Sequence, residues 1–351
     1  MQTTPCLGWP SRTLWMMILS LFLSSLAQAA ALTPVDEFGN NPGKLRMYEY
    51  VPQGLKEGSP LVVVLHGCGQ SAELYGQGAG WVALADRFGF ALVLPEQQES
   101  NNPSKCFNWF NGFAWGDYFP WNYQWYGSDI DRDNGEAASI VAMLGSALRK
   151  HRLDPQRVFI TGLSGGGAMT AVMLATYPER FAGGAVIAGV PYKCATDPYT
   201  ALSPSECGLD YSAKRGNARI KSLPPAIWGD KVRDAHKGFR GTWPRLSIWH
   251  GTADGTVVDA SADELEKQWR NVLGLEQVPA NNEQQADPKH RHVTYRDAQG
   301  RVQLEVHRIS GMGHGTPIID GRCGRKGEHL FDIGICSSEQ IGRFWGVVPG
   351  Q

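Results

Sequence analysis

The chain has 351 residues, and its 33 Lys and Arg residues nearly balance its 34 Asp and Glu residues, giving a formal net charge of −1. This balance, with no basic cluster interleaved with aromatic residues, argues against nucleic acid as a partner. The length allows one large α/β domain with long loops.

The N-terminus has the pattern of an export signal. A polar start ends at Arg12, an apolar run covers residues 14–26, and Ala27-Gln28-Ala29 has the small-x-small cleavage pattern. The run is shorter than the roughly 18 to 20 residues that a membrane span needs, which argues against an uncleaved anchor. We therefore expect a secretion signal peptide over residues 1–29 and a mature protein that is secreted, periplasmic or extracellular, without membrane association.

Beyond this segment, short apolar runs alternate with segments of helical character. Strands are expected at residues 45–51, 61–65, 91–95, 158–161, 183–189, 245–251 and 302–309, and helices at 81–88, 135–150, 262–273, 338–345 and up to Tyr177. This alternation predicts an α/β fold, with a mostly parallel central sheet, helices on both faces and an antiparallel first edge. The polar stretch at residues 279–292 is expected to be one surface loop, so that residues 30–351 form a single domain.

Six cysteines remain after removal of the expected signal peptide, which takes Cys6 away. An even number in an exported chain favours disulfides, and six cysteines allow 15 pairings. No CxxC or Cys/His spacing is typical of zinc, so no metal is expected. The pairs of sequence neighbours that would cross-link loops are Cys68 with Cys106, Cys194 with Cys207 and Cys323 with Cys336.

One serine stands in a setting that indicates nucleophilic chemistry. The segment Gly162-Leu163-Ser164-Gly165-Gly166 has the G-x-S-x-G pattern, follows the apolar run at 158–161 and precedes a small-residue helix pattern. Such a strand-to-helix turn lifts a serine hydroxyl clear of a sheet. Serine is a poor nucleophile alone, so it needs a base within hydrogen-bond reach and an acid that orients the base.

The chain offers both partners in the expected order of serine, acid and histidine. Asp254 follows the run at 245–251, and His314 follows the run at 302–309 between two glycines. Asp259 is the weaker acid candidate, because it is expected to begin the next helix. Five other histidines are weaker base candidates, because they are expected before the acid in the chain order, in a turn, in the polar loop or within a strand: His66, His250, His290, His292 and His307.

An attacked carbonyl oxygen gains negative charge and requires backbone N–H donors. Gly165, the residue after the nucleophile, and Cys68, in the loop after the run at 61–65, are the expected donors. A disulfide between Cys68 and Cys106 would hold that loop rigid and so preorganise the oxyanion donor. An equally good interpretation is that the disulfide only cross-links the loop.

These motifs resemble those of the extracellular short-chain polyhydroxyalkanoate (PHB) depolymerases, which are close to the feruloyl and acetylxylan esterases. The resemblance covers roughly residues 40–347 and rests on LHGCGQ, PEQQ, CFNWF, NGEAASI, GLSGGGAMTAVMLATYPERFAGGAVIAGVPYKCA, IWHGTADGTV and GMGHGTP. It implies an α/β-hydrolase fold and cofactor-free ester hydrolysis, with Ser164, Asp254 and His314 as triad and Cys68 and Gly165 as oxyanion donors.

Three departures from the family pattern stand out. The family usually has alanine where this chain has Gly165, a change that keeps the N–H but loosens the turn. No linker and separate substrate-binding domain are expected after the catalytic part. The segment 107–126 is longer than usual and holds 11 aromatic residues in 20, either packed on the domain or forming an apolar platform for substrate. The candidates for substrate contact are Trp109, Trp115, Trp121 and Trp125.

The sequence therefore predicts a monomeric, secreted serine esterase that hydrolyses poly(3-hydroxybutyrate)-type polyester or its oligomers through an acyl-enzyme. A feruloyl or acetylxylan esterase is the alternative with the same machinery. A non-catalytic polymer-binding module is the third reading, which the presence of all three triad residues disfavours.

Overall fold

The computed structural model describes residues 1–2, 31–110, 129–201, 203, 205–210, 218–283, 285 and 287–350. The chain divides into two units, Met1–Ala30 and Ala31–Gln351, and the second holds the strands and helices of the fold. The expected signal peptide falls on the first unit and stays a prediction. Among the described residues, no helix combines the length and apolar character that a membrane crossing requires.

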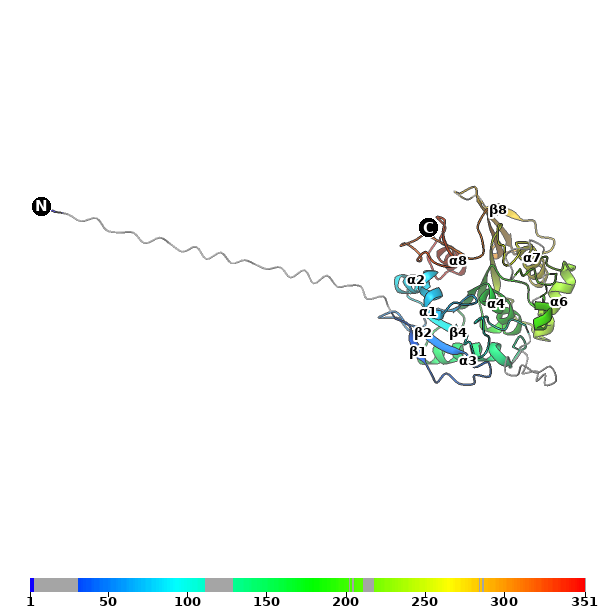
Figure 1. Cartoon of the computed structure of the whole chain (residues 1–351), viewed down its shortest axis with the longest axis horizontal. Coiled ribbons are helices and arrows are strands. Elements are labelled where there is room, and N and C mark those ends of the chain that lie inside the picture. The colour runs from blue at the N-terminus through cyan, green and yellow to red at the C-terminus, as the bar shows by residue number, and fades with distance from the viewer. Residues whose placement is uncertain are drawn as a thin grey trace. The chain divides into compact units, whose positions relative to one another are not determined.

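A ten-stranded sheet forms the centre of this unit (Figure 1). Six neighbouring strands pair in parallel, and an antiparallel group of two strands flanks them on either side. In spatial order the strands are β1 (Thr33–Val35), β2 (Arg46–Tyr50), β4 (Ala91–Glu96), β3 (Leu61–Leu65), β5 (Val158–Leu163), β6 (Gly183–Ile187), β7 (Arg245–Gly251), β10 (Val302–Ile309), β9 (His290–Arg296) and β8 (Asn281–Glu283). A separate parallel pair joins β11 (Thr316–Ile318) and β12 (Leu330–Asp332).

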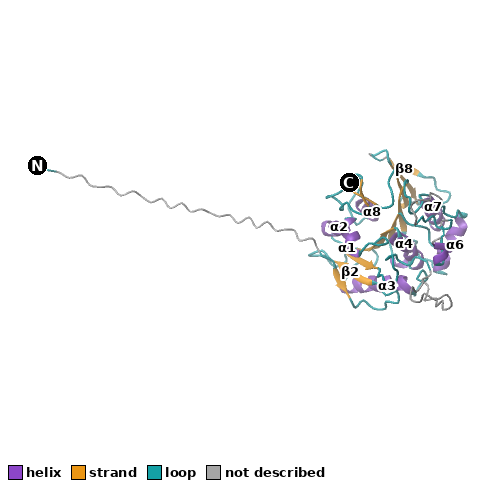
Figure 2. Ribbon diagram, in the orientation of Figure 1, coloured by secondary structure: helices purple, strands orange, loops and turns teal. Residues whose placement is uncertain are grey.

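Helices cover both faces of the sheet (Figure 2). One layer holds α1 (Ala72–Gly78), α2 (Trp81–Phe88) and α8 (Ser337–Trp345), and the other holds α3 (Gly135–Lys150), α4 (Gly165–Thr176), α6 (Pro225–Ala235) and α7 (Ala260–Val272). The short elements η1 (Pro178–Arg180) and α5 (Pro198–Ala201) lie in connections. Because both faces are covered, β3 and β5 are buried along their whole length, as their apolar sequences require. The expected α/β-hydrolase architecture is confirmed.

The expectation of one surface loop at residues 279–292 is wrong. Strand β8 and the start of β9 lie there, and β9 pairs with β10 over its full length. Val293 and Tyr295 are buried, whereas Arg291 and Arg296 are exposed. In β9 apolar residues alternate with polar ones, so the mostly polar composition of the segment predicts a loop where a strand forms.

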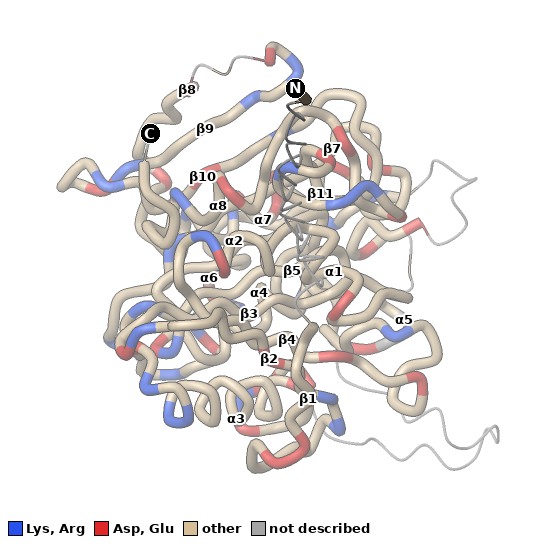
Figure 3. The backbone as a smooth tube through the Cα atoms, turned by 90° about the vertical axis from the view of Figure 1, so that its left-hand side faces the viewer, with Lys and Arg blue, Asp and Glu red and all other residues tan. Residues whose placement is uncertain are grey.

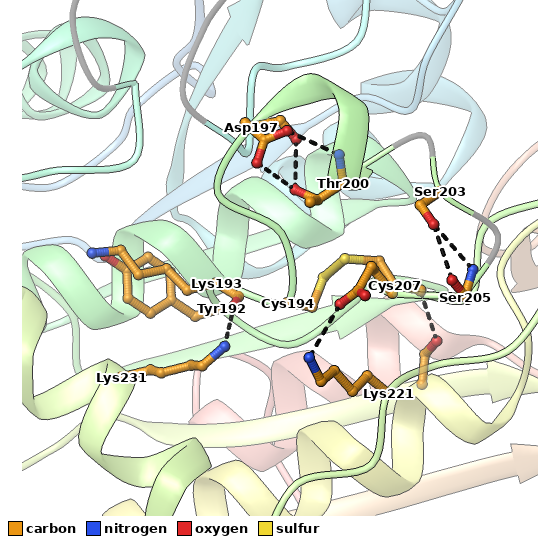
Figure 4. Close-up of a disulfide and its surroundings, with 12 residues drawn as sticks. Tyr192, Lys193, Cys194, Asp197, Thr200, Ser203, Ser205, Cys207, Lys221 and Lys231 are labelled. Atoms are coloured by element: carbon orange, nitrogen blue, oxygen red, sulfur yellow. Dashed lines mark hydrogen bonds and ion pairs between the residues drawn. A yellow bond between two sulfur atoms is a disulfide. The ribbon is translucent and has the colours of Figure 1, made fainter.

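Three disulfides join Cys68 to Cys106, Cys194 to Cys207 and Cys323 to Cys336, the pairing of sequence neighbours. Figure 4 shows the second of them, where Lys231 Nζ donates to the Lys193 carbonyl at 2.6 Å beside the bridge. This bridge fixes the connection that leads from β6 towards Leu209, which pairs with Val257. The charged residues of both signs are interspersed over the described backbone (Figure 3).

Candidate active site

Ser164 lies at the junction of β5 and α4 in a conformation that non-glycine residues rarely adopt. Its φ is 56° and its ψ is −119°, and its backbone N–H donates to the Ile187 carbonyl at 2.9 Å. A Cβ at Gly162 would lie 2.3 Å from the Gly166 carbonyl oxygen, and one at Gly166 would lie 2.5 Å from the His66 carbonyl oxygen. The glycines therefore let the chain turn sharply against β3, and the serine is held at the carboxyl end of β5.

A cavity with mostly apolar walls opens at this end of the sheet. Ser164 lines it and is partly buried. The cavity also collects residues from the loops after β3, β6, β7 and β10, because carboxyl ends of parallel strands meet at one edge. Its lining consists of Gly67, Cys68, Trp109, Leu163, Ser164, Gly165, Ala168, Gly189, Val190, Leu209, Thr256, Val257, His314 and His329.

His314, which lines the same cavity as Ser164, contacts Asp254. The Nδ1 atom of His314 is 2.7 Å from Oδ2 of Asp254, and the other carboxylate oxygen accepts backbone N–H bonds from Thr256 and Val257, both at 2.9 Å. Because the carboxylate only accepts, His314 Nδ1–H donates and its Nε2 keeps a lone pair that can take a proton.

The side chain of Asp254 is fully buried, yet its carboxyl group stays ionised. Burial raises its pKa, but the hydrogen bonds from His250 and His314 outweigh burial and hold the pKa well below its usual range. The site therefore keeps a negative charge under the imidazole of His314, which stabilises the imidazolium that forms when a proton is taken up.

Backbone contacts lock the loops that carry these two side chains. The Ala253 N–H donates to the Met312 carbonyl at 3.0 Å, and a Cβ at Gly251 would lie 2.2 Å from the same oxygen. His329 Nδ1–H donates to the His314 carbonyl at 2.8 Å, and its ring packs edge-on against that of His314. The position of His314 is thus set by two segments distant in sequence, residues 251–254 and His329.

His250 is a member of this site that sequence reasoning missed, because it was expected in a turn. It is the sixth residue of β7 and fully buried, and its Nε2–H donates to the Val257 carbonyl at 2.9 Å. The same nitrogen lies 3.3 Å from Oδ2 of Asp254. The spacing of four residues between His250 and Asp254, across a strand end, is the one sequence signal of this contact.

The expected oxyanion donors lie together at the cavity. A Cβ at Gly165 would lie 3.0 Å from Sγ of Cys68, so glycine lets the Cys68–Cys106 disulfide approach the start of α4 closely. Gly165 begins that helix, and the first N–H groups of a helix have no intrahelical partner. Both residues line the cavity beside Ser164.

Trp109 forms part of the cavity wall and is 5% exposed. The N–H of the preceding residue, Asn108, donates at 2.9 Å to the buried carboxyl of Glu136, which also accepts from Gln97 at 2.5 Å. Burial raises the pKa of Glu136 well above its ordinary value and that of Asp129, beside it, to about 7. The other three tryptophans of the expected platform lie outside the described residues: Trp115, Trp121 and Trp125.

A serine on a strand-to-helix turn, in one cavity with the histidine of a histidine-aspartate pair at the carboxyl edge of a parallel sheet, is typical of an α/β-hydrolase-type enzyme. The family model described as "Esterase PHB depolymerase" matches residues 45–286, and the chain belongs to this family. It is a carboxylic ester hydrolase.

Similar proteins are named as a polyester depolymerase, a feruloyl esterase and an acetyl xylan esterase. The chain is 41% identical over 328 residues to poly(3-hydroxyalkanoate) depolymerase C of Paucimonas lemoignei, covering 92% of this chain and 72% of the relative. It is 34% identical over 288 residues to feruloyl esterase B of Neurospora crassa, covering 82% and 89%. The solved structure of an acetyl xylan esterase from Aspergillus awamori superimposes with a TM-score of 0.70 at 25% identity, covering 91% of this chain and all of that one.

Proposed function

We propose that Ser164, His314 and Asp254 form a catalytic triad that hydrolyses poly(3-hydroxybutyrate)-type polyester or its oligomers. The observation that carries this proposal is the 2.7 Å contact of Asp254 with His314, which lines the same cavity as Ser164.

The reaction follows from the protonation states of the site. Ser164 Oγ attacks the ester carbonyl while His314 Nε2 takes its proton, and the backbone N–H groups of Gly165 and Cys68 stabilise the oxyanion. His314 then gives the proton to the departing alkoxide, which leaves an acyl-enzyme on Ser164. Water, deprotonated by the same imidazole, releases the acid and restores the serine.

The lining of the cavity supports an uncharged ester substrate. Apart from His314 and His329, its described lining residues carry no side chain that ionises, since Cys68 is in a disulfide. Apolar walls from Trp109, Val190 and Leu209 would bury an aliphatic acyl unit. Esters of short hydroxyalkanoic acids are neutral and partly apolar, as this lining requires.

A feruloyl or acetylxylan esterase is the second candidate. The similarity to the acetyl xylan esterase structure over nearly the whole chain supports it, and the indole of Trp109 offers a face for an aromatic acyl group.

Export is the third part of the proposal. Three disulfides persist only in an oxidising compartment, which supports secretion with residues 1–29 as the signal.

One substrate panel separates these functions. The purified protein is assayed for clearing of a poly(3-hydroxybutyrate) suspension, release of ferulate from methyl ferulate, and release of acetate from acetylated xylan. We expect clearing of the polyester, and none with Ser164→Ala. Hydrolysis of only the plant-type esters would favour the second candidate, and undiminished turnover by Ser164→Ala would refute the mechanism.

A further inference from the structure

A cluster of ionisable side chains lies at the antiparallel end of the sheet, outside the cavity of the candidate active site. Its members are His290 and His292 of β9 and Glu305 and His307 of β10. In the register of the two strands, His292 stands directly across from His307. Since successive side chains of a strand point to opposite faces, Glu305 and His307 share one face while Val306 packs in the core on the other.

Three of these side chains are spaced like the ligands of a metal ion. One ligand atom from each of His292, Glu305 and His307 lies within 4.8 Å of the other two. His292 Nε2 is 3.2 Å from Glu305 Oε2, and His307 Nε2 is 3.2 Å from Glu305 Oε1. Tetrahedral bonds of about 2.0 to 2.1 Å separate neighbouring ligands by about 3.3 Å, which is close to both separations.

The Nε2 atom of His307 is buried and, among the described residues, has no hydrogen-bond partner. The ring is 1% exposed, and its Nδ1 lies 2.8 Å from His290 Nε2. When His307 Nδ1–H donates to His290, Nε2 presents a lone pair towards the carboxylate of Glu305. In this tautomer a cation bound between the two atoms satisfies both.

The charged neighbours of Glu305 point the same way. In the described part of the chain, the ion-pair partners of Glu305 within 4.0 Å are His292 and His307, with no Lys or Arg.

Each candidate ligand also has a partner that fixes its orientation. The pairs are His307 with His290 at 2.8 Å, His292 with Gln285 at 3.3 Å, and Glu305 with Ser247 at 2.6 Å. The indole of Trp249 stacks flat on His307, with ring centroids 3.6 Å apart. Such second contacts to metal ligands set the tautomer and direction of each ligand, and they are usual in metal centres.

We propose that His292, Glu305 and His307 bind one Zn²⁺ ion, which clamps β9 to β10. Two imidazoles and a carboxylate suit zinc, whereas Mg²⁺ and Ca²⁺ prefer oxygen ligands. His292, which is 15% exposed in its side chain, gives the ion a path from solvent. On binding, the ring proton of His292 moves from Nε2 to Nδ1, so that the imidazole stays neutral and Nε2 offers its lone pair to the ion. Cysteine spacing could not indicate this zinc site, because its proposed ligands are two histidines and a glutamate that the pairing of β9 with β10 brings together.

The test is a zinc titration of the full chain, purified without a polyhistidine tag and stripped with EDTA. We expect one equivalent of Zn²⁺ to bind by calorimetry, the melting temperature to rise with Zn²⁺ but not with Mg²⁺, and His292→Gln to weaken binding about 100-fold. The matched control is His151→Gln, since His151 Nε2 also lies 3.0 Å from a buried glutamate, Glu49, but without a third ligand. This control is expected to bind Zn²⁺ like the unaltered chain.

A second measurement does not depend on the folding of any variant. X-ray absorption of the zinc-loaded protein is expected to show two imidazoles and light oxygen ligands. An absence of binding at 100 µM Zn²⁺, on the order of a weak surface site, would overturn the proposal. Equal affinity of His292→Gln, or a coordination shell with no imidazole or only one, would overturn it as well.

Discussion

Replacing Asp254 by asparagine tests the proposed orientation of His314 most directly. The new side chain can keep its oxygen on the N–H groups of Thr256 and Val257, which now bond to Oδ1 at 2.9 Å. Its amide then points N–H hydrogens at Nδ1 of His314, where Oδ2 accepts at 2.7 Å in the native protein. The imidazole must therefore move its proton to Nε2, and it can no longer take the proton of Ser164.

The expected loss is large because both the tautomer and the charge change. A wrong tautomer in a serine triad lowers kcat by about 10⁴-fold, which corresponds to about 5 kcal/mol of transition-state stabilisation. KM should change little, since Asp254 does not itself line the cavity.

The assay is the steady-state hydrolysis of p-nitrophenyl butyrate, with circular dichroism to verify the fold. Asp259→Asn is the matched control: the side chain of Asp259 is half exposed, and the residue stands at the N-cap position of α7, without a side-chain capping hydrogen bond, five residues further along the chain. It should retain activity within about twofold, as surface substitutions do. Activity of Asp254→Asn within tenfold of the native rate, or a comparable loss in the control, would refute the assignment of the acid.

Three further predictions concern residues around the site. His250→Gln should lower kcat about tenfold at unchanged KM, because one of the two histidine contacts of Asp254 is lost; unchanged kcat in steady-state assays would exclude a positioning role. Removing the disulfide with Cys68→Ala and Cys106→Ala should lower the free energy of unfolding by about 4 kcal/mol, given the separation of 38 residues; urea unfolding measures this, and a change below 1 kcal/mol, about the size of an ordinary point substitution, would contradict it. Burial raises the native pKa of Asp129 to about 7 from an ordinary value of 3.8, so the native state holds this proton more tightly than the unfolded chain does. The contribution of this proton to stability is therefore lost as pH rises from about 4 to 7. Asp129→Asn should flatten the fall in melting temperature between pH 5 and pH 8, and parallel curves for both proteins would contradict this account.

The parallel strands at the centre of the sheet could be predicted because each is recognisable from its own sequence, without knowing which strand it pairs with. LVVVL and VFIT are continuous apolar runs, as strands covered on both faces must be, and they form β3 and β5. Strand β9 was missed since His292 and Thr294 lie on its polar face and only alternate residues are apolar. Helix α1 is short and rich in glycine, and a Cβ at Gly76 would lie 2.4 Å from Leu94, so packing and not helix propensity selects its sequence.

Chain order led to Ser164, Asp254 and His314, because each follows a recognisable strand and strand ends share one edge. The contacts of His250 and His329 could not be found in this way. Both depend on how loops fold back: His250 reaches the Val257 carbonyl, and His329 reaches the backbone of His314. The histidine and glutamate cluster escaped notice for the same reason, since the register of β9 against β10 is a property of the folded sheet.

The disulfides separate two tasks within the molecule. Each closes a segment at its base, with Cα atoms 4.2 Å apart at Cys68 and Cys106, 5.4 Å at Cys194 and Cys207, and 5.8 Å at Cys323 and Cys336. The first segment carries α1, α2 and β4 and is therefore constrained by the core, whereas the segment between Cys194 and Cys207 lies outside the central sheet. That connection can change in length or composition while its two ends keep their spacing, and the sheet edge that holds the reacting atoms stays the same.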